Sequence, residues 1–406
     1  MKCRFCNTQL QTEFIDLGYS PPSNSFMKDL ESGEVSYPLK AFVCDNCYLV
    51  QLDEYEKANE IFSEDYVYFS SMSSTWLAHS KDYVEMMISE FGIGQDSYVM
   101  EIASNDGYLL QYFKQEGVKV IGVEPTLSTA TVARNKGIES ITEFFGRDFA
   151  RNFASERGKC DLVLGNNVLA HVPDINDFVS GIKEVLSDDG IVTMEFPHIL
   201  NLIELNQFDT IYHEHFSYLS FTTVRKIFKS HGMDMFHVQE ITTHGGSLRV
   251  FAKHEQNKSL EVRTTVQNLV AKEVKYGITD LKYYENFQEV AFKIKTDLLN
   301  FLLIAKSENK KVAAYGAAAK GNTLLNYAGV KSDLIDFVVD RAESKIGKFL
   351  PFSHIPVLEE SELEKQKPDY IIILPWNISG EIQDQLTYSK NWGAKFVTFI
   401  PDLKIF

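Results

Sequence analysis

Two pairs of cysteines near the N-terminus limit most strongly what the first part of this chain can fold into. Cys3 pairs with Cys6, and Cys44 pairs with Cys47, each with C-x-x-C spacing. Two such turns supply four thiolates in the tetrahedral arrangement that Zn²⁺ prefers, and a four-cysteine site leaves no open position for water. The spacing therefore predicts a structural zinc site. Residues 7–43, between the pairs, exceed a compact loop and are expected to contain strands.

Disulfide bonds are the alternative interpretation of these cysteines. The first residues lack the apolar core of a secretory signal, and no apolar stretch reaches the roughly 18 residues that a membrane helix needs. We therefore expect a soluble cytoplasmic protein with no membrane contact, and disulfides are rare in the cytosol. The fifth cysteine, Cys160, lies beside an apolar run and is interpreted as a packing residue.

Charge and composition exclude some classes of function. The 40 Lys and Arg residues against 56 Asp and Glu residues give a net charge of −16, so we expect no nucleic-acid partner. Hydrophobic residues make up 44% of the chain, which is typical of a protein that buries ordinary cores. A length of 406 residues suggests two or three domains.

Short apolar strands alternate with helical spans from residue 97 onward, and this alternation predicts a parallel sheet with helical crossovers. Two later strands flank His244 and are interpreted as an antiparallel hairpin. A mostly parallel sheet that ends in such a hairpin is typical of class I methyltransferases. A charged helical stretch (255–308) and a second α/β set then predict a small doubly wound domain. The expected strands are 98–102, 118–123, 161–164, 191–196, 236–242, 248–253, 311–316, 335–339, 370–374 and 396–400, and the expected helices include 77–91, 176–186 and 222–231.

A polar turn after the first strand of this sheet indicates a nucleoside cofactor. Its single glycine disfavours a dinucleotide, whose pyrophosphate needs close backbone approach, whereas S-adenosylmethionine tolerates bulkier residues there. An acidic residue that ends the second strand can bind ribose hydroxyls, and an Asn pair ends the fourth. The alternative is that the two glutamates only cap strand ends. The predicted cofactor-binding residues are Glu101, Ala103, Asn105, Gly107, Glu124, Asn166 and Asn167.

The segment 212–218 is dense in titratable side chains and follows the fifth strand. A histidine there can remove a proton near neutral pH, and Tyr or a second His can hydrogen-bond a developing oxyanion. The H-x-H spacing lacks the third ligand of a catalytic zinc site. The alternative is a solvated turn. His171 follows the fourth strand, where acceptors bind in this fold, and is as consistent with a structural role when taken alone.

Together these motifs resemble the zinc-containing sugar C-methyltransferases that act on nucleotide-linked keto-deoxysugars. The resemblance spans nearly the whole chain and includes the four cysteines and the segments 101–107, 166–171, 212–215, 244–249 and 315–322. It implies an α/β protein whose class I methyltransferase Rossmann-like core lies between an N-terminal zinc-binding module and a C-terminal Rossmann-like domain. The implied boundaries are 1–75, 76–256 and 257–406.

The resemblance also implies roles for individual residues. His215 is expected to be the general base. Tyr212, Glu214 and His171 would position the sugar or stabilise its enolate, and Tyr66 would reach in from the N-terminal side. The small-residue turn around Lys320 opens a helix and is assigned to the sugar diphosphate, although it could be only a tightly packed turn. The implied substrate-binding residues are His244, Arg249, Tyr315, Lys320 and Asn322.

The expected reaction is methylation, by S-adenosylmethionine, of C3 in a dTDP- or GDP-linked 4-keto-6-deoxy sugar, because the neighbouring ketone acidifies the C3 proton. Two alternatives stay open at this point. One is an O- or N-methyltransferase acting on another small acceptor, and the other is a non-catalytic zinc-ribbon binding protein. We expect a monomer or a weak homo-oligomer.

Overall fold

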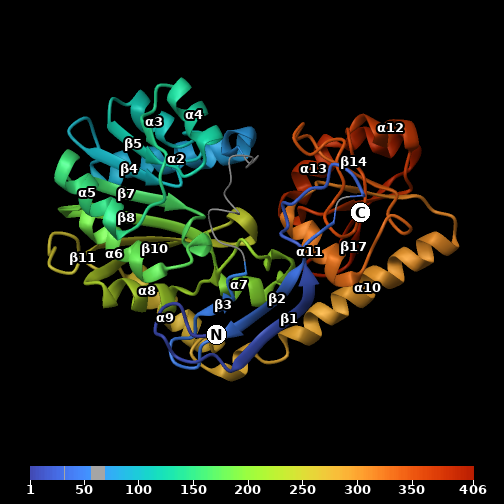
Figure 1. The fold of residues 1–406 in the computed structure, drawn as a ribbon, viewed down its shortest axis with the longest axis horizontal. Helices are drawn as coiled ribbons and strands as arrows, with labels where there is room; N and C mark the ends of the chain where they lie inside the picture. The colour runs from blue at the N-terminus through green and yellow to red at the C-terminus, as the bar shows by residue number, and fades with distance from the viewer. Residues whose placement is uncertain (32, 56–68) are drawn as a thin grey trace.

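The computed structural model describes residues 1–31, 33–55 and 69–406, and it contains three β-sheets. Figure 1 shows a seven-stranded sheet on the left, a six-stranded sheet on the right, and the N-terminal strands beneath them. No described helix is both long enough and apolar enough to cross a membrane.

The seven-stranded sheet confirms the predicted class I methyltransferase core. Its order is β10-β11-β8-β7-β4-β5-β6, and read from β6 it becomes 3-2-1-4-5-7-6 when these strands are numbered along the chain. The strands from β4 to β8 pair in parallel, and β11 is antiparallel to both β8 and β10, which is the expected hairpin. The strands are β4 (Tyr98–Ile102), β5 (Lys119–Val123), β6 (Ser140–Ile141), β7 (Cys160–Asn166), β8 (Leu186–Pro197), β10 (Met233–Ile241) and β11 (Ser247–His254).

Helices connect these strands, and side chains cap the first turns of some of them. Asp174 accepts hydrogen bonds from the first amides of α6, and Ser220 accepts one from Thr223 at the start of α8, so both ends satisfy otherwise unpaired N–H groups. Both helices lie within a residue of their predicted bounds. The helices are α2 (Ser74–Phe91), α3 (Leu110–Gln115), α4 (Leu127–Asn135), α5 (Arg147–Arg157), α6 (Ile175–Val185), α7 (Ile199–Glu204) and α8 (Phe221–Ser230).

The N-terminal sheet has the order β1-β2-β3-β9 and joins two distant parts of the chain. The strands are β1 (Thr12–Ser20), β2 (Tyr37–Val43), β3 (Val50–Leu52) and β9 (Ser217–Tyr218). Strands β1 and β2 confirm the expectation of strands between the cysteine pairs. β9 follows His215 almost directly and pairs with β3, so the cysteine-bearing sheet supports the predicted catalytic segment.

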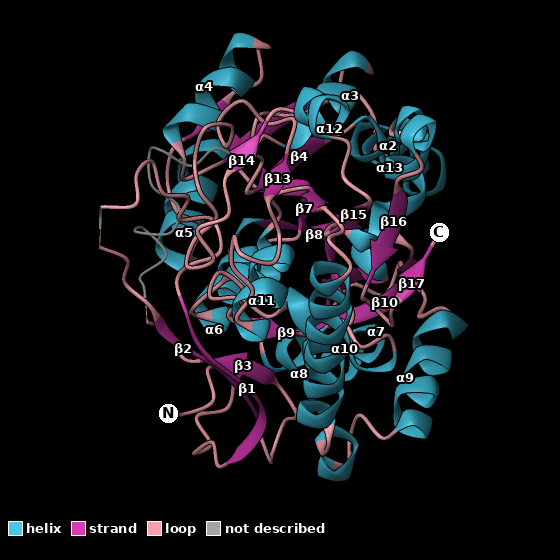
Figure 2. Cartoon of the chain, turned by 90° about the vertical axis from the view of Figure 1, so that its right-hand side faces the viewer, coloured by secondary structure: helices cyan, strands magenta, loops and turns pink. Residues whose placement is uncertain are grey.

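The six-stranded sheet confirms the predicted second α/β unit. Its strands pair in parallel except β17, in the order β14-β13-β12-β15-β16-β17. They are β12 (Val312–Tyr315), β13 (Phe337–Val339), β14 (Val357–Leu358), β15 (Tyr370–Ile373), β16 (Lys395–Thr398) and β17 (Lys404–Ile405). The helices are α9 (Thr264–Tyr276), α10 (Phe287–Ser307), α11 (Ala319–Ala328), α12 (Ser361–Gln366) and α13 (Ser379–Gln385). Figure 2 shows α10 standing between β1–β3 and α9, and α10 contacts both β1 and α11.

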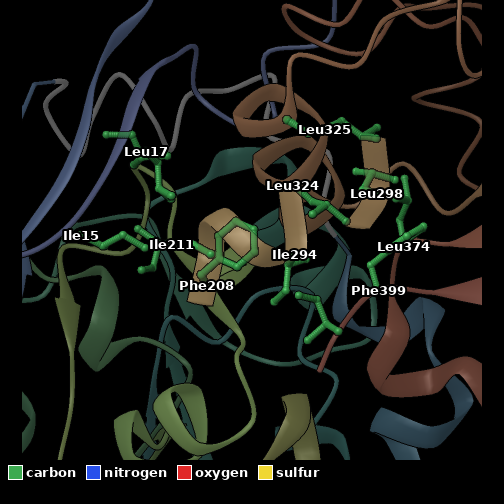
Figure 3. Close-up of a cluster of buried hydrophobic side chains, with 14 of the residues drawn as sticks. Ile15, Leu17, Phe208, Ile211, Ile294, Leu298, Leu324, Leu325, Leu374 and Phe399 are labelled. Atoms are coloured by element: carbon green, nitrogen blue, oxygen red, sulfur yellow. The ribbon is translucent and has the colours of Figure 1, made fainter. Parts of the chain in front are cut away.

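One apolar core joins the N-terminal strands, the middle segment and the C-terminal unit. Figure 3 shows it at the junction, with side chains from β1, from residues 208–211, from α10 and α11, and from the edge of the six-stranded sheet. Burying each such side chain contributes roughly 1.5–3 kcal/mol, so the three parts are held in a fixed relation around the site between them. The labelled residues are Ile15, Leu17, Phe208, Ile211, Ile294, Leu298, Leu324, Leu325, Leu374 and Phe399.

Candidate active site

The four predicted metal ligands gather into one cluster. Their sulfur atoms all lie within 4.8 Å of one another, and the Cys3–Cys47 and Cys6–Cys44 distances are both 3.5 Å. Four sulfurs around a zinc ion at about 2.3 Å would be about 3.8 Å apart, so the cluster fits the ion. The Gln51 side-chain amide also donates to the Cys3 sulfur at 3.3 Å, which suits a thiolate. The fifth cysteine, Cys160, is fully buried in the core, as predicted.

Both C-x-x-C turns have the same backbone geometry. The N–H of Asn7 donates to the carbonyl of Cys3 at 3.0 Å, and the N–H of Tyr48 donates to the carbonyl of Cys44 at 2.9 Å. Asn7 and Tyr48 both adopt positive φ, at 62° and 66°. These matching turns direct the two sulfur pairs at one another.

A pocket at the carboxyl ends of β4, β5 and β7 brings the predicted cofactor residues together. Its lining includes Ala103, Asn105, Glu124, Asn166 and Asn167. The aromatic side chains Phe144, Phe145 and Phe178 and the half-buried His171 complete the wall. Such a site offers an acidic group for ribose, apolar surface for adenine, and amides for the methionine end, so the residues fit S-adenosylmethionine.

The turn 103–107 is shaped by left-handed backbone. Ala103, Asn105 and Gly107 all have positive φ, and the N–H of Asn105 donates to a Glu124 carboxylate oxygen at 2.9 Å. The N–H of Thr126 donates to the other oxygen at 2.9 Å. These bonds orient the Glu124 carboxylate at the pocket, where a carboxylate can accept hydrogen bonds from ribose hydroxyls.

Two predicted cofactor residues do not line this pocket. Glu101 is fully buried beneath the turn, and burial raises the pKa of its carboxyl group well above the ordinary value. Gly107 packs against residues 133 and 138, and a Cβ there would lie 2.5 Å from the Ile138 side chain. Both residues therefore shape the turn from behind, and sequence position alone did not separate this role from direct contact.

The predicted base, His215, is fixed in one tautomer by its neighbours. Its Nδ1 lies 3.0 Å from the carbonyl oxygen of Thr210, which can only accept, so Nδ1 carries the proton. Its Nε2 lies 2.9 Å from the hydroxyl of Tyr212, which donates to it. The Nε2 atom therefore holds the lone pair of the ring, and the Tyr212 hydroxyl must turn away before that lone pair can remove a substrate proton.

His171 connects this base to the cofactor pocket. The His171 and His215 rings meet edge to face with centroids 4.7 Å apart, and His171 lines the pocket. Burial lowers the pKa of His171 to about 4. Burial also lowers the pKa of His215 well below its ordinary value, and His171 lowers it further. Both imidazoles are therefore neutral near pH 7, as a general base requires.

The other residues assigned to the catalytic group are less closely associated. Glu214 is buried and accepts a hydrogen bond from the Asn24 side chain at 3.2 Å, so it contacts the N-terminal loop, and burial raises its pKa. Tyr66 lies outside the described residues. Its predicted role stays a prediction.

Arg249 is held in a buried cluster behind the pocket. Its guanidinium lies 3.0 Å from Glu195, which also lies 2.9 Å from His79, and both Arg249 and Glu195 are buried. The His79 ring stacks on Trp76 at 4.9 Å, and Trp76 lines the pocket. These contacts support the pocket wall, and the sugar-binding role of Arg249 stays a prediction. His79, Glu195 and Trp76 were not predicted from sequence.

Lys320 and His244 lie at the junction between the two α/β units. The Lys320 ammonium donates to Asn377 at 2.7 Å and sits 4.6 Å from the Trp376 ring centre. His244 has a φ of 54°, and its Nε2 lies 2.9 Å from the Asn167 amide nitrogen. Burial, together with the nearby charge of Lys320, lowers the pKa of His244 to about 4.

The remaining predicted substrate residues contact other partners. The Asn322 amide donates to the carbonyl of Ser23 at 2.7 Å, and the Tyr315 hydroxyl bonds Gln385. In the small-residue turn, the N–H of Ala317 already donates to the Asp340 carboxylate at 2.7 Å. A carboxylate at this amide disfavours a diphosphate there, so the assignment of the turn stays a prediction.

Comparisons with known proteins match three parts of the chain. Family models described as a zinc binding domain, a methyltransferase domain and a C-methyltransferase C-terminal domain match residues 3–62, 79–238 and 242–401. The C-methyltransferase NovU of Streptomyces niveus is 32% identical over 406 residues, covering 100% of this chain and 96% of that protein.

Two solved structures illustrate the more distant likenesses. Magnesium protoporphyrin IX methyltransferase from Synechocystis, with bound S-adenosylhomocysteine, is 17% identical and has a TM-score of 0.36. The match covers 48% of this chain and 90% of that chain. A methyltransferase from Anabaena variabilis is 12% identical and has a TM-score of 0.40. The match covers 50% of this chain and 99% of that chain.

The strand order, the pocket and the cysteine cluster define a class I S-adenosylmethionine-dependent methyltransferase with a structural zinc site. The full-length match then gives its family: the chain belongs to the zinc-containing C-methyltransferases. The open alternatives, a non-catalytic zinc-ribbon protein and an O- or N-methyltransferase, are not supported.

Proposed function

We propose that this C-methyltransferase methylates C3 of a nucleotide-linked 4-keto-6-deoxy sugar in deoxysugar biosynthesis. The observation that carries the proposal is His215, whose Nε2 lies 2.9 Å from the Tyr212 hydroxyl and whose ring meets that of His171, a residue that lines the cofactor pocket. A base at that place suits an acceptor whose nucleophile must be made by removing a proton from carbon.

The chemistry needs few groups. S-adenosylmethionine, when bound, supplies the sulfonium methyl that the acceptor attacks. His215 would take the C3 proton, the electron pair of that bond would delocalise onto the C4 oxygen, and the resulting enolate carbon would attack the sulfonium methyl, with S-adenosylhomocysteine as the leaving group. Holding base, sugar and cofactor in one pocket lowers the barrier because the groups meet already oriented. The hydroxyl of Tyr212 and the ring of His171 lie where they can orient the sugar ketone.

The proposed function includes the domain boundaries, the nucleotide, the oligomeric state and the location that the sequence predicts. The boundaries 1–75, 76–256 and 257–406 describe a zinc module, a cofactor-binding core and a C-terminal unit that helps bind the nucleotide. Both dTDP and GDP remain candidate nucleotides. A monomer or weak homo-oligomer in the cytoplasm stays the expectation.

Mass spectrometry tests the reaction directly. The protein is incubated with S-adenosylmethionine and a dTDP- or GDP-linked 4-keto-6-deoxyhexose, and the sugar is examined for a gain of one methylene unit, with His215→Ala as the matched variant. A gain that depends on His215, with the methyl located on C3 by NMR, supports the proposal. A protein that binds S-adenosylmethionine but methylates neither sugar contradicts the proposed acceptor.

A further inference from the structure

A short 3₁₀ turn, η3 (Phe208–Thr210), holds the base on one side and the C-terminal unit on the other. The carbonyl of Thr210 accepts the His215 Nδ1–H at 3.0 Å. The carboxylate of the adjacent residue, Asp209, accepts the indole N–H of Trp376 at 2.7 Å. Asp209 is fully buried. The positions of His215 and Trp376 are therefore set by neighbouring residues of one turn.

Trp376 in turn fixes a lysine. The Lys320 ammonium lies 4.6 Å from the centre of the Trp376 ring, a cation–π distance, and donates to the side-chain oxygen of Asn377 at 2.7 Å. One turn farther along α11, the Thr323 hydroxyl donates to the carbonyl of Ile211 at 3.0 Å. These contacts lock the first turn of α11 against the segment that carries His215.

The rim of the Trp376 ring is confined as well. A Cβ added at Gly245 would lie 2.5 Å from the Trp376 ring, so the indole packs directly against the turn that carries His244. His244 reaches the Asn167 amide, which lines the cofactor pocket. Lys320 is thereby held close to the predicted reaction centre.

The ammonium of Lys320 has capacity left for a ligand. It is half-buried, and its partners are a neutral amide and an aromatic ring. Among the described residues, no carboxylate oxygen lies within 4.0 Å of it. The buried Asp209 carboxylate acts on this ammonium electrostatically from beyond 4.0 Å. An ammonium has three N–H donors, so donors remain for a ligand oxygen.

We propose that Lys320 is a catalytic residue, whose ammonium stabilises the oxyanion that forms on C4 of the sugar, and that Asp209 and Trp376 are positioning residues that hold it there. This inference rests on the proposed function. His215 takes the C3 proton, the C3–H electron pair forms the C3=C4 bond, and the carbonyl electrons move to oxygen beside Lys320. Transfer of the methyl then restores the ketone and leaves S-adenosylhomocysteine, and His215 returns the proton to solvent.

The competing role for Lys320 is the one predicted from sequence, a contact with the sugar diphosphate. The two roles differ in what they change. A diphosphate contact strengthens ground-state binding, so its loss raises KM or the Kd for a nucleoside diphosphate. An oxyanion contact acts in the transition state, and its loss lowers the rate at saturating sugar, typically by about 10²–10³-fold.

Exchange of the C3 proton with D₂O, measured at saturating dTDP-4-keto-6-deoxyhexose without methyl donor, separates these roles when combined with dTDP binding. For Lys320→Met we expect exchange to fall about 100-fold or more, with the Kd for dTDP within twofold of wild type. Lys320→Arg, which keeps the charge, should recover part of the rate. Lys306→Met, an exposed lysine on α10, is the control.

The proposal is overturned if Lys320→Met exchanges the C3 proton at the wild-type rate, whatever its affinity for dTDP. It is also overturned if this variant loses exchange and dTDP binding together. Trp376→Phe removes the indole N–H that bonds Asp209 and shortens the ring beside Lys320. It should lower exchange by about tenfold with unchanged S-adenosylmethionine binding. If the wild-type protein neither exchanges nor methylates any keto-sugar, the proposed function itself fails, before any variant is compared.

Discussion

Replacing Arg249 by Met distinguishes a structural from a substrate-binding role for this residue. The guanidinium lies 3.0 Å from Glu195, donates to Gln239 at 3.2 Å, and covers the Tyr83 ring at 4.8 Å. Without Arg249, the buried Glu195 carboxylate keeps only the contacts to His79 and Thr243, at 2.9 and 3.1 Å.

The magnitude follows from the burial of this pair. Removing one partner of a buried ion pair costs about 3–5 kcal/mol. Because two hydrogen-bonding groups still serve Glu195, we expect the lower end, about 3 kcal/mol. At about 2–4 °C per kcal/mol for a unit of this size, Tm should fall by about 6–12 °C. Replacing Glu195 by Met as well removes the stranded charge and should restore most of the stability.

Thermal unfolding and steady-state kinetics measure both consequences. Arg263→Met is the matched control, since Arg263 is an exposed arginine 3.4 Å from Glu90, and such surface pairs contribute at most about 1 kcal/mol. The reasoning is refuted if Arg249→Met unfolds at the wild-type temperature and instead raises KM for the nucleotide sugar. That outcome would return Arg249 to the sugar site.

Three further outcomes are expected. Cys6→Ser or zinc chelation should lower Tm and activity together, because β3 supports β9. Added zinc should restore both after chelation, and activity lost with an unchanged Tm would contradict a structural role of the metal. Glu124→Gln should weaken S-adenosylmethionine binding about tenfold, measured by calorimetry, while dTDP binding stays constant; equal losses for both ligands would contradict a cofactor role. The lowered pKa of His215 keeps the base neutral, so kcat/KM should stay level as pH falls through 6.5 and decline only below it, whereas a half-maximal rate at pH 6.5 would place an ordinary histidine there.

The fold was largely predictable because its pattern is local. Alternating apolar strands and amphipathic helices identified the class I sheet, and the flanking strands around His244 identified its antiparallel hairpin. The cysteine spacing identified the metal cluster because both turns are formed by contacts within a few residues. The pairing of β9 with β3 was not predictable, because a two-residue strand carries no periodic signal.

The site was predictable only where a side chain follows directly from its strand. Glu124, Asn105 and Asn166 follow strand ends and line the pocket. The contacts of Arg249 and Asn322 with Glu195 and with the carbonyl of Ser23 were not predictable, because these partners lie far away in the sequence.

Asp209 and Trp376 were not predicted as site residues. Their importance comes from the hydrogen bond between them, which crosses the junction of the two α/β units. One available signal was the rarity of tryptophan. The chain has only three, and Trp76 and Trp376 both lie at the site.

The central claim is that His215 generates a carbon nucleophile, and exchange of the sugar C3 proton with D₂O in the absence of S-adenosylmethionine tests it most directly. We predict that the wild-type protein introduces deuterium at C3 and that His215→Asn does not, while both bind S-adenosylmethionine equally. Undiminished exchange in His215→Asn, or a methylated product with its methyl on oxygen and no exchange at C3, would contradict the account.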